Sequence, residues 1–126
     1  MREVLLVGAG GFLGAAARYY IGGWVHRFVA PGFPWGTWVV NVSGCLLLGV
    51  LMGTLQTRAA VAPEWRLFGG IGVLGGYTTF STLSYETVEL MRRGQQWQAL
   101  ANGASSLVAG CVAVVIGVAL VRWLLG

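Results

Sequence analysis

Four long apolar stretches, separated by short polar connections, dominate the chain and limit the folds that it can adopt. An α-helix needs about 20 apolar residues to cross the hydrocarbon core of a bilayer, and each stretch is long enough. The predicted helices cover residues 4–29, 35–55, 65–91 and 97–125. Because the connections are short, successive helices should be antiparallel neighbours in one four-helix transmembrane domain, residues 1–126. The predicted fold class is an all-α integral membrane protein.

The composition agrees with a membrane location and argues against several functions. Of the 126 residues, 56% are hydrophobic and 10% are charged, whereas soluble domains carry about 25% charged residues. The net charge is +4, but the arginines form no stripe that would bind nucleic acid and are better placed to contact lipid headgroups. His26 has no companion metal ligands, and no nucleophile has a base beside it, so nothing indicates an enzyme.

The arginines near the helix ends divide almost equally between the two sides of the membrane. One side receives Arg2, Arg58, Arg66 and Arg122, and the other receives Arg27, Arg92 and Arg93. The positive-inside rule then gives almost no orientation signal, as expected for a protein that inserts in both orientations. Two such chains could pair as an antiparallel homodimer about an axis in the membrane plane. A single orientation with a weak charge bias is the alternative.

A glycine pair followed by hydroxyl residues interrupts the third apolar stretch, from Gly75 onward. Glycine admits non-helical torsions, so residues 74–79 are predicted to unwind and to leave carbonyl groups that can bind a cation. A second half-helix then begins near Thr79, where exposed amides and the helix dipole favour an anion. Lipid cannot satisfy the freed backbone, so the break must be buried in protein or line an aqueous cavity. A simple glycine kink is the alternative.

Other polar residues could extend a path from this break. One face of the second half-helix is predicted to carry Phe80, Leu83, Ser84 and Thr87. Polar pairs spaced four residues apart occur on the second and fourth helices, at Thr37 with Asn41 and at Asn102 with Ser106. Each pair alone is more typical of contacts between helices than of a permeation track.

Glycines in the first two helices, such as Gly11, Gly14 and Gly49, suit close contact between helices. Residues 8–14 also mimic a dinucleotide-binding turn. That interpretation requires a following strand and an acidic residue about 20 positions later, and the sequence has neither. Packing is therefore the expected role of these glycines.

Three motifs in order along the chain carry a specific resemblance. They are GFLGAAARY at residues 11–19, GTWVVNVSG at residues 36–44 and GGYTTFST at residues 75–82. In this order they resemble the Fluc (CrcB) family of fluoride channels, over essentially the whole chain. The resemblance implies an antiparallel, dual-topology homodimer in the cell inner membrane. Such a dimer would export fluoride passively from the cytoplasm through two pores.

The resemblance also implies the residues of each site. A structural sodium ion would be held by the backbone carbonyls at the positions of Gly75 and Thr78. Phe80 matches the first of the pore phenylalanines, whose ring edges face fluoride. The polar track would comprise Asn41, Thr37, Ser81, Thr82 and Ser106. Glu86 resembles a carboxylate placed along the pore, and Arg18 resembles a vestibule arginine.

Leu83 departs from the family pattern, which usually has a second aromatic residue three positions after the first. An aliphatic side chain has no quadrupole edge to offer an anion, so Leu83 could impair conduction. One alternative function is a small dual-topology, proton-coupled multidrug exporter, which would want a carboxylate in the middle of its first helix. This chain has glycines and Arg18 there. Another alternative is a membrane subunit that transports nothing.

Overall fold

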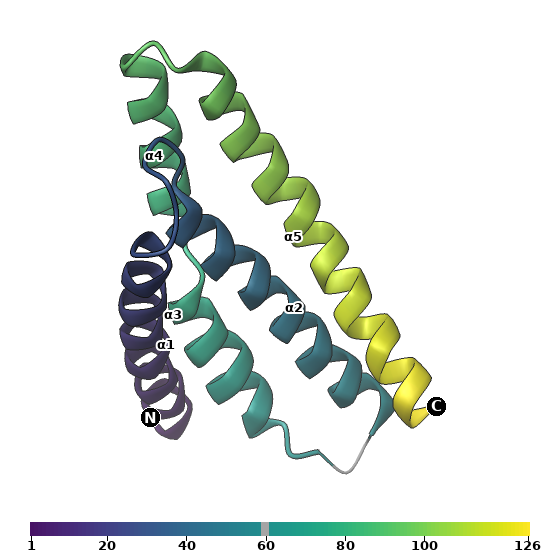
Figure 1. Cartoon of the computed structure of the whole chain (residues 1–126). Helices are drawn as coiled ribbons and strands as arrows, with labels where there is room; N and C mark the ends of the chain where they lie inside the picture. The colour runs from purple at the N-terminus through teal and green to yellow at the C-terminus, as the bar shows by residue number, and fades with distance from the viewer. Residues whose placement is uncertain (59–60) are drawn as a thin grey trace.

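The computed structural model describes residues 1–58 and 61–126, and the elements within these ranges are all helical (Figure 1). They are α1 (Arg2–His26), α2 (Trp35–Thr57), η1 (Arg66–Leu74), α3 (Gly75–Tyr77), α4 (Phe80–Arg92) and α5 (Gln96–Leu125). Together η1, α3 and α4 form the third of four helical segments, which is bent. The predicted all-α fold with a broken third helix is therefore confirmed.

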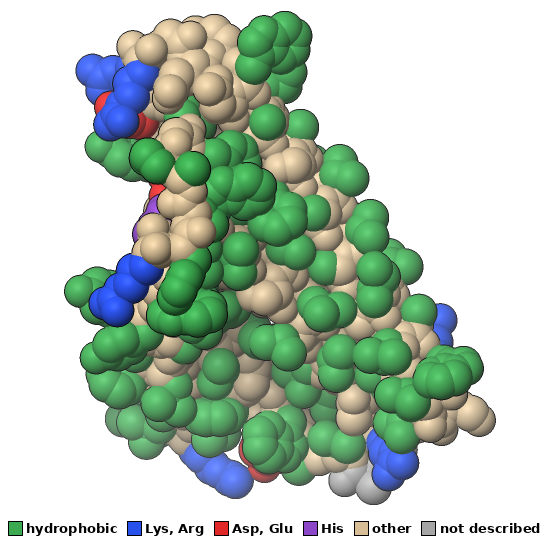
Figure 2. Space-filling model, in the orientation of Figure 1, with side chains coloured by type: hydrophobic (Ala, Val, Ile, Leu, Met, Phe, Trp, Pro, Cys, Tyr) green, Lys and Arg blue, Asp and Glu red, His purple; other side chains and the backbone are tan. Residues whose placement is uncertain are grey.

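The surface of the fold is suited to lipid. Among the described residues, three helices are long and apolar enough to span a bilayer, namely α1, α2 and α5. Hydrophobic side chains cover most of the face shown in Figure 2, and charged side chains lie along its edges. Soluble monomers rarely expose apolar patches of this extent. The third segment is divided by its bend into pieces shorter than a membrane span.

Glycine allows the backbones of neighbouring helices to approach closely. Where α1 packs against α3, a Cβ added at Gly76 would lie only 2.6 Å from the carbonyl oxygen of Gly11. Where α2 runs beside α5, a Cβ added at Gly117 would lie 2.5 Å from the carbonyl oxygen of Leu46 (Figure 1). The expected packing role is confirmed at Gly11, whereas Gly8 has no described atom within 4 Å of its added Cβ.

The break in the third segment is shorter than the sequence predicts. Residues 74–77 remain helical, with Gly75 at φ −65° and ψ −36°, after a π-helix over Arg66–Leu74. Only Thr78 (φ −81°, ψ 156°) and Thr79 (φ −149°, ψ 115°) are extended. Glycine permits unwinding but does not impose it, and here the adjacent Gly76 packs on α1 within a helical turn. The break therefore depends on the contacts that hold the two threonines.

The first helix ends at His26, earlier than the predicted residue 29. The amides of Arg27 and Phe28 fold back onto the carbonyls of Trp24 and Val25, at 3.1 and 3.0 Å. The chain then turns through Gly32, at φ 121°, before α2 begins at Trp35. This tight return brings the end of α1 beside the start of α2.

Candidate functional site

The break is held open by one side chain from α2. The Asn41 Nδ2 group donates to the carbonyl oxygen of Thr79 at 3.0 Å, and the Thr79 amide donates to Asn41 Oδ1 at 2.7 Å. Asn41 thus satisfies both backbone groups of a residue that is only 8% exposed. Buried backbone groups require such partners, so Asn41 stabilises the extended conformation. This role as a clamp was not predicted from the sequence.

The hydroxyl run after the break caps α4. Thr79 Oγ1 accepts a hydrogen bond from the Thr82 amide at 3.2 Å and donates to Thr82 Oγ1 at 3.0 Å. The Ser81 hydroxyl lies 3.2 Å from the same oxygen. Threonine is a favoured residue at this capping position because its oxygen satisfies an amide that the helix leaves free. Ser81 and Thr82, predicted to join a polar track, lie at the cap and do not line the groove beside it.

A groove of about 730 Å³ opens between the break, α2, α4 and α5. Its walls are mainly apolar, with a few polar groups. The lining residues include Asn41, Gly75, Phe80, Leu83, Thr87 and Ser106. The predicted face of α4 is confirmed, since Phe80, Leu83, Ser84 and Thr87 all line the groove. The Phe80 ring is 82% exposed, so nothing within the described chain covers this side of the groove.

Two buried polar atoms on α5 have no hydrogen-bond partner in the described part of the chain, Asn102 Oδ1 and Ser106 Oγ. The Asn102 amide donates to Thr87 Oγ1 at 3.0 Å, and that hydroxyl donates onward to the Leu83 carbonyl at 2.7 Å. Since the Thr87 hydrogen is already used, Asn102 must present its NH₂ group to Thr87. Ser106 lines the groove with its hydroxyl uncommitted, and such a hydroxyl can donate to a bound anion or water.

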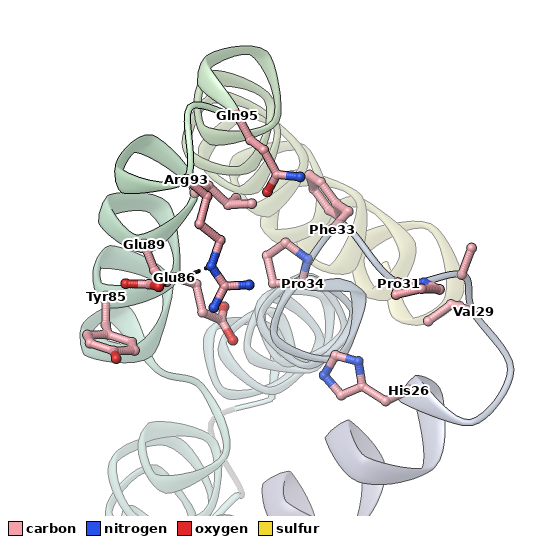
Figure 3. Close-up of a pocket in the computed structure, with 13 residues that line it drawn as sticks. His26, Val29, Pro31, Phe33, Pro34, Tyr85, Glu86, Glu89, Arg93 and Gln95 are labelled. Carbon is pink, nitrogen blue, oxygen red and sulfur yellow. Dashed lines mark hydrogen bonds and ion pairs between the residues drawn. The ribbon is translucent and has the colours of Figure 1, made fainter.

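Thr37 and Glu86 meet at the far end of α4. The Thr37 hydroxyl donates to Glu86 Oε1 at 2.8 Å, while Glu86 Oε2 is buried and has no partner among the described residues. Glu86 points into a second cavity, of about 440 Å³, together with Glu89 and Arg93 (Figure 3). The structure therefore brings Thr37 to Glu86, and it separates this pair from the groove at the break.

The carbonyl groups at the break form an oxygen site that a hard cation could use. In a continuous α-helix the Thr79 amide would bond the Gly75 carbonyl, but here it bonds Asn41. The Thr78 carbonyl accepts a long hydrogen bond from Arg18 Nη1, at 3.4 Å, and keeps a second lone pair. Carbonyl oxygens are ligands of hard cations, but the Arg18 guanidinium already brings positive charge to the Thr78 carbonyl. The described residues include no cluster of three or more His, Cys, Asp or Glu side chains that could hold a metal.

Residues 5–118 match the profile of a family described as CrcB-like protein, Camphor Resistance (CrcB). The chain belongs to the CrcB family. It is 44% identical over 122 residues to the Fluoride-specific ion channel FluC of Rhizobium meliloti (strain 1021), with 97% of this chain and 98% of that protein covered. It is 46% identical over 131 residues to the protein of the same name in Anaeromyxobacter dehalogenans (strain 2CP-1 / ATCC BAA-258), and both chains are covered completely.

As a CrcB protein, the chain is a multi-pass membrane protein. Its two relatives described above are ion channels and not enzymes, in agreement with the prediction that this chain is no enzyme. The resemblance inferred from the three sequence motifs is confirmed.

The CrcB site also contains residues that sequence patterns did not single out. Thr79 was expected to end the unwound segment and to begin the second half-helix, but its role as the residue that Asn41 clamps was not foreseen. His26 showed no functional pattern, yet it lines the cavity of Glu86. The signal for Thr79 was its position just before a hydroxyl-rich helix start, which is typical of a cap. No local signal could have revealed His26, because the turn between α1 and α2 brings it there.

Proposed function

We propose that this chain is a fluoride-specific ion channel that lets fluoride leave the cytoplasm passively across the cell inner membrane. The observation that carries the proposal is its 44% identity, over nearly the full length of both chains, to a fluoride-specific channel. The geometry supports it, because a small hydrated anion crosses a membrane only where hydrogen-bond donors replace its water. The residues along the groove include two such donors, the second Asn41 amide hydrogen and the Ser106 hydroxyl, which is buried behind the groove wall without a partner among the described residues.

The proposed anion path follows α4. It would join the groove, lined by Phe80, Leu83, Asn41 and Ser106, to the separate cavity of Glu86, whose carboxylate Thr37 contacts. The positive edge of the Phe80 ring would face the anion. Ser81 and Thr82, at the cap of α4 beside the groove, would join this path at its edge, and Arg18 would provide positive charge next to the Thr78 carbonyl.

We further propose that the channel is an antiparallel homodimer whose chains insert in both orientations. The open groove supports this proposal, because its apolar lining is left uncovered by the described chain. Phe80 is 82% and Leu107 is 69% exposed, and a partner chain could bury them. A second copy is favoured as the cover by the nearly equal arginine counts on the two sides. The carbonyls of Gly75 and Thr78 would hold a structural sodium ion, which supplies positive charge that attracts an anion in a low-dielectric interior.

Flux measurements on the purified protein test the channel function directly. Liposomes that contain only this protein should release fluoride rapidly when a potassium ionophore balances the charge, and they should retain chloride. Protein-free liposomes provide the background leak. Absence of fluoride release from both the natural chain and the Leu83→Phe variant would overturn the proposal.

The dimer can be tested by fixing the orientation of each chain. The variant Gln95→Lys/Gln96→Lys adds positive charge to the connection before α5, and Gln56→Lys/Thr57→Lys adds it to the opposite side. By the positive-inside rule each variant should insert in one orientation only. Each should give no fluoride flux alone, and co-expression of the two should restore it. Full flux from either variant alone would overturn the antiparallel arrangement.

A further inference from the structure

The cavity beside the second half of α4 is lined by side chains from two segments of the chain. One is the end of α1, and the other is the end of the third segment. His26 points into it from the end of α1, while Glu86, Glu89 and Arg93 point into it from α4 (Figure 3). It opens to solution, and the only histidine of the chain is visible as a purple patch in the notch at the left of Figure 2. An ion that enters or leaves past Glu86 would therefore pass His26.

The charges in this cavity are not evenly balanced. Arg93 Nε pairs with Glu89 Oε1 at 3.0 Å, so the charge of Glu89 is compensated within α4. Glu86 forms no ion pair with any described residue, and its Oε2 atom is buried without a donor. A carboxylate in this state repels an approaching anion. An anion path past Glu86 thus requires positive charge near that carboxylate.

His26 is held where it can supply this charge. Its ring lies over Gly36 at the start of α2, where an added Cβ would be only 2.7 Å from His26 Nε2. Glycine at this position therefore leaves the space that the imidazole fills. The imidazole lines the same cavity as the Glu86 carboxylate. No hydrogen bond from another described residue ties the imidazole down.

The other groups that face His26 do not replace it. Among the described lining residues, the other titratable and charged ones are Tyr85, Glu86 and Glu89 from α4 and Arg93 directly after it. The start of α2 and the start of α5 contribute no charged side chain to the lining. Since Arg93 is committed to Glu89, His26 is the remaining side chain in this lining that can carry positive charge.

We propose that His26 is a positioning residue of the ion path, which acts through Glu86 by offsetting its negative charge when the imidazole is protonated. The inference rests on the proposed fluoride channel. Histidine is the side chain that changes charge between about pH 5 and 8. Because the protonated imidazole favours the anion, fluoride flux should increase as the pH falls through this range. Partly exposed charge pairs of this kind change an equilibrium about two- to fivefold.

Fluoride release from liposomes at about pH 6 and about pH 8, with the same pH on both sides, tests the inference. After subtraction of the leak through protein-free liposomes, the natural chain should conduct about two- to fivefold faster at the lower pH. His26→Asn should abolish the difference in flux between the two pH values and give the slower rate at both. His26→Lys should give the faster rate at both pH values. Arg27→Gln, at a neighbouring position outside the cavity lining, should keep the natural ratio.

The variant Glu86→Gln tests whether the charge of His26 affects fluoride flux through Glu86 or acts directly on the ion. In a conducting Glu86→Gln background, exchange of His26 for Asn should change the ratio little. If Glu86→Gln does not conduct, the flux of His26→Asn is compared with that of His26→Lys. A faster rate with lysine than with asparagine at both pH values then supports the role of positive charge at residue 26. An unchanged pH ratio in His26→Asn would overturn the role of His26 and leave the channel intact. No fluoride flux from the natural chain at either pH would instead overturn the channel itself.

Discussion

The two halves of the third segment are held in place by different means. The first half, η1 and α3, is rich in glycine and packs its backbone against α1. The second half, α4, buries only Leu90 and is fixed by polar contacts, namely the Asn41 clamp, the Thr79 cap and the bond from Thr37 to Glu86. Backbone packing thus forms the anchor, while the residues of the proposed fluoride path, such as Phe80 and Glu86, lie on the half fixed by hydrogen bonds.

The largest loss of stability is expected where an added side chain would push η1 and α3 away from α1. Gly76→Ala adds a Cβ that would lie 2.6 Å from the Gly11 carbonyl oxygen and 3.0 Å from its Cα. Because the obstacle is backbone, overpacking should cost about 3 kcal/mol or more. The measurement is the yield of monodisperse protein and its thermal unfolding. Gly23→Ala is the matched control, since its Cβ meets no described atom within 4 Å, and a similar loss there would contradict the anchor.

The next prediction compares two polar contacts that α2 makes with the third segment. Asn41 contacts Thr79 at the start of α4, and Ser43 contacts Tyr77 in α3. Asn41→Ala leaves the Thr79 amide and carbonyl unpaired, at about 1–3 kcal/mol for each buried group. Fluoride flux should be lost and thermal stability should fall. Ser43 lies on the same helix and contacts the Tyr77 hydroxyl at 3.0 Å. Ser43→Ala should keep flux, and loss of flux in both variants to the same extent would remove the distinction between the halves.

A smaller effect is expected at the far end of α4. Thr37→Val removes the hydroxyl that donates to Glu86 at 2.8 Å. A hydrogen bond to a charged group contributes about 1.5–3 kcal/mol, so fluoride flux should fall about tenfold. The control is Thr54→Val on the same helix, where the hydroxyl bonds only back to the Val50 carbonyl. Equal flux from Thr37→Val and the natural chain would show that this end of α4 needs no polar contact.

The smallest effect concerns an apolar position on α4. Leu83→Phe introduces a ring with a positive edge into the groove that Phe80 already lines. Aromatic edge interactions contribute about 0.5–1.5 kcal/mol, and the lower part of this range corresponds to an increase in flux of about two- to fivefold. Leu83→Met keeps the position apolar and flexible and should change flux little. A decrease in flux with phenylalanine would indicate that Leu83 is the better residue at this point of the path.

Much of the fold could be predicted because it depends on local patterns. Apolar runs of membrane length predicted the helices, and the start of α2 at Trp35 agrees with its prediction. The face of α4 followed from helical spacing of Phe80, Leu83 and Thr87. Three motifs in order were enough to identify the CrcB family.

The details of the break and of the far cavity could not be predicted, because they depend on residues distant in sequence. The glycine pair suggested unwinding over residues 74–79, yet the extended residues are the two threonines that Asn41 can reach. His26 and Glu86 are 60 positions apart and meet only through the turn before α2. Spacing along one helix carries no information about such contacts.

The contact between Asn41 and Thr79 also has a consequence for how the protein is made. Hydrocarbon offers no partner for the amide and carbonyl of an extended Thr79, and both find their partner only when α2 lies alongside. A newly synthesised third segment that enters the bilayer alone is therefore most stable as a continuous helix. Two residues would unwind late in assembly, as Asn41 docks, and α4 would acquire its final direction at that step.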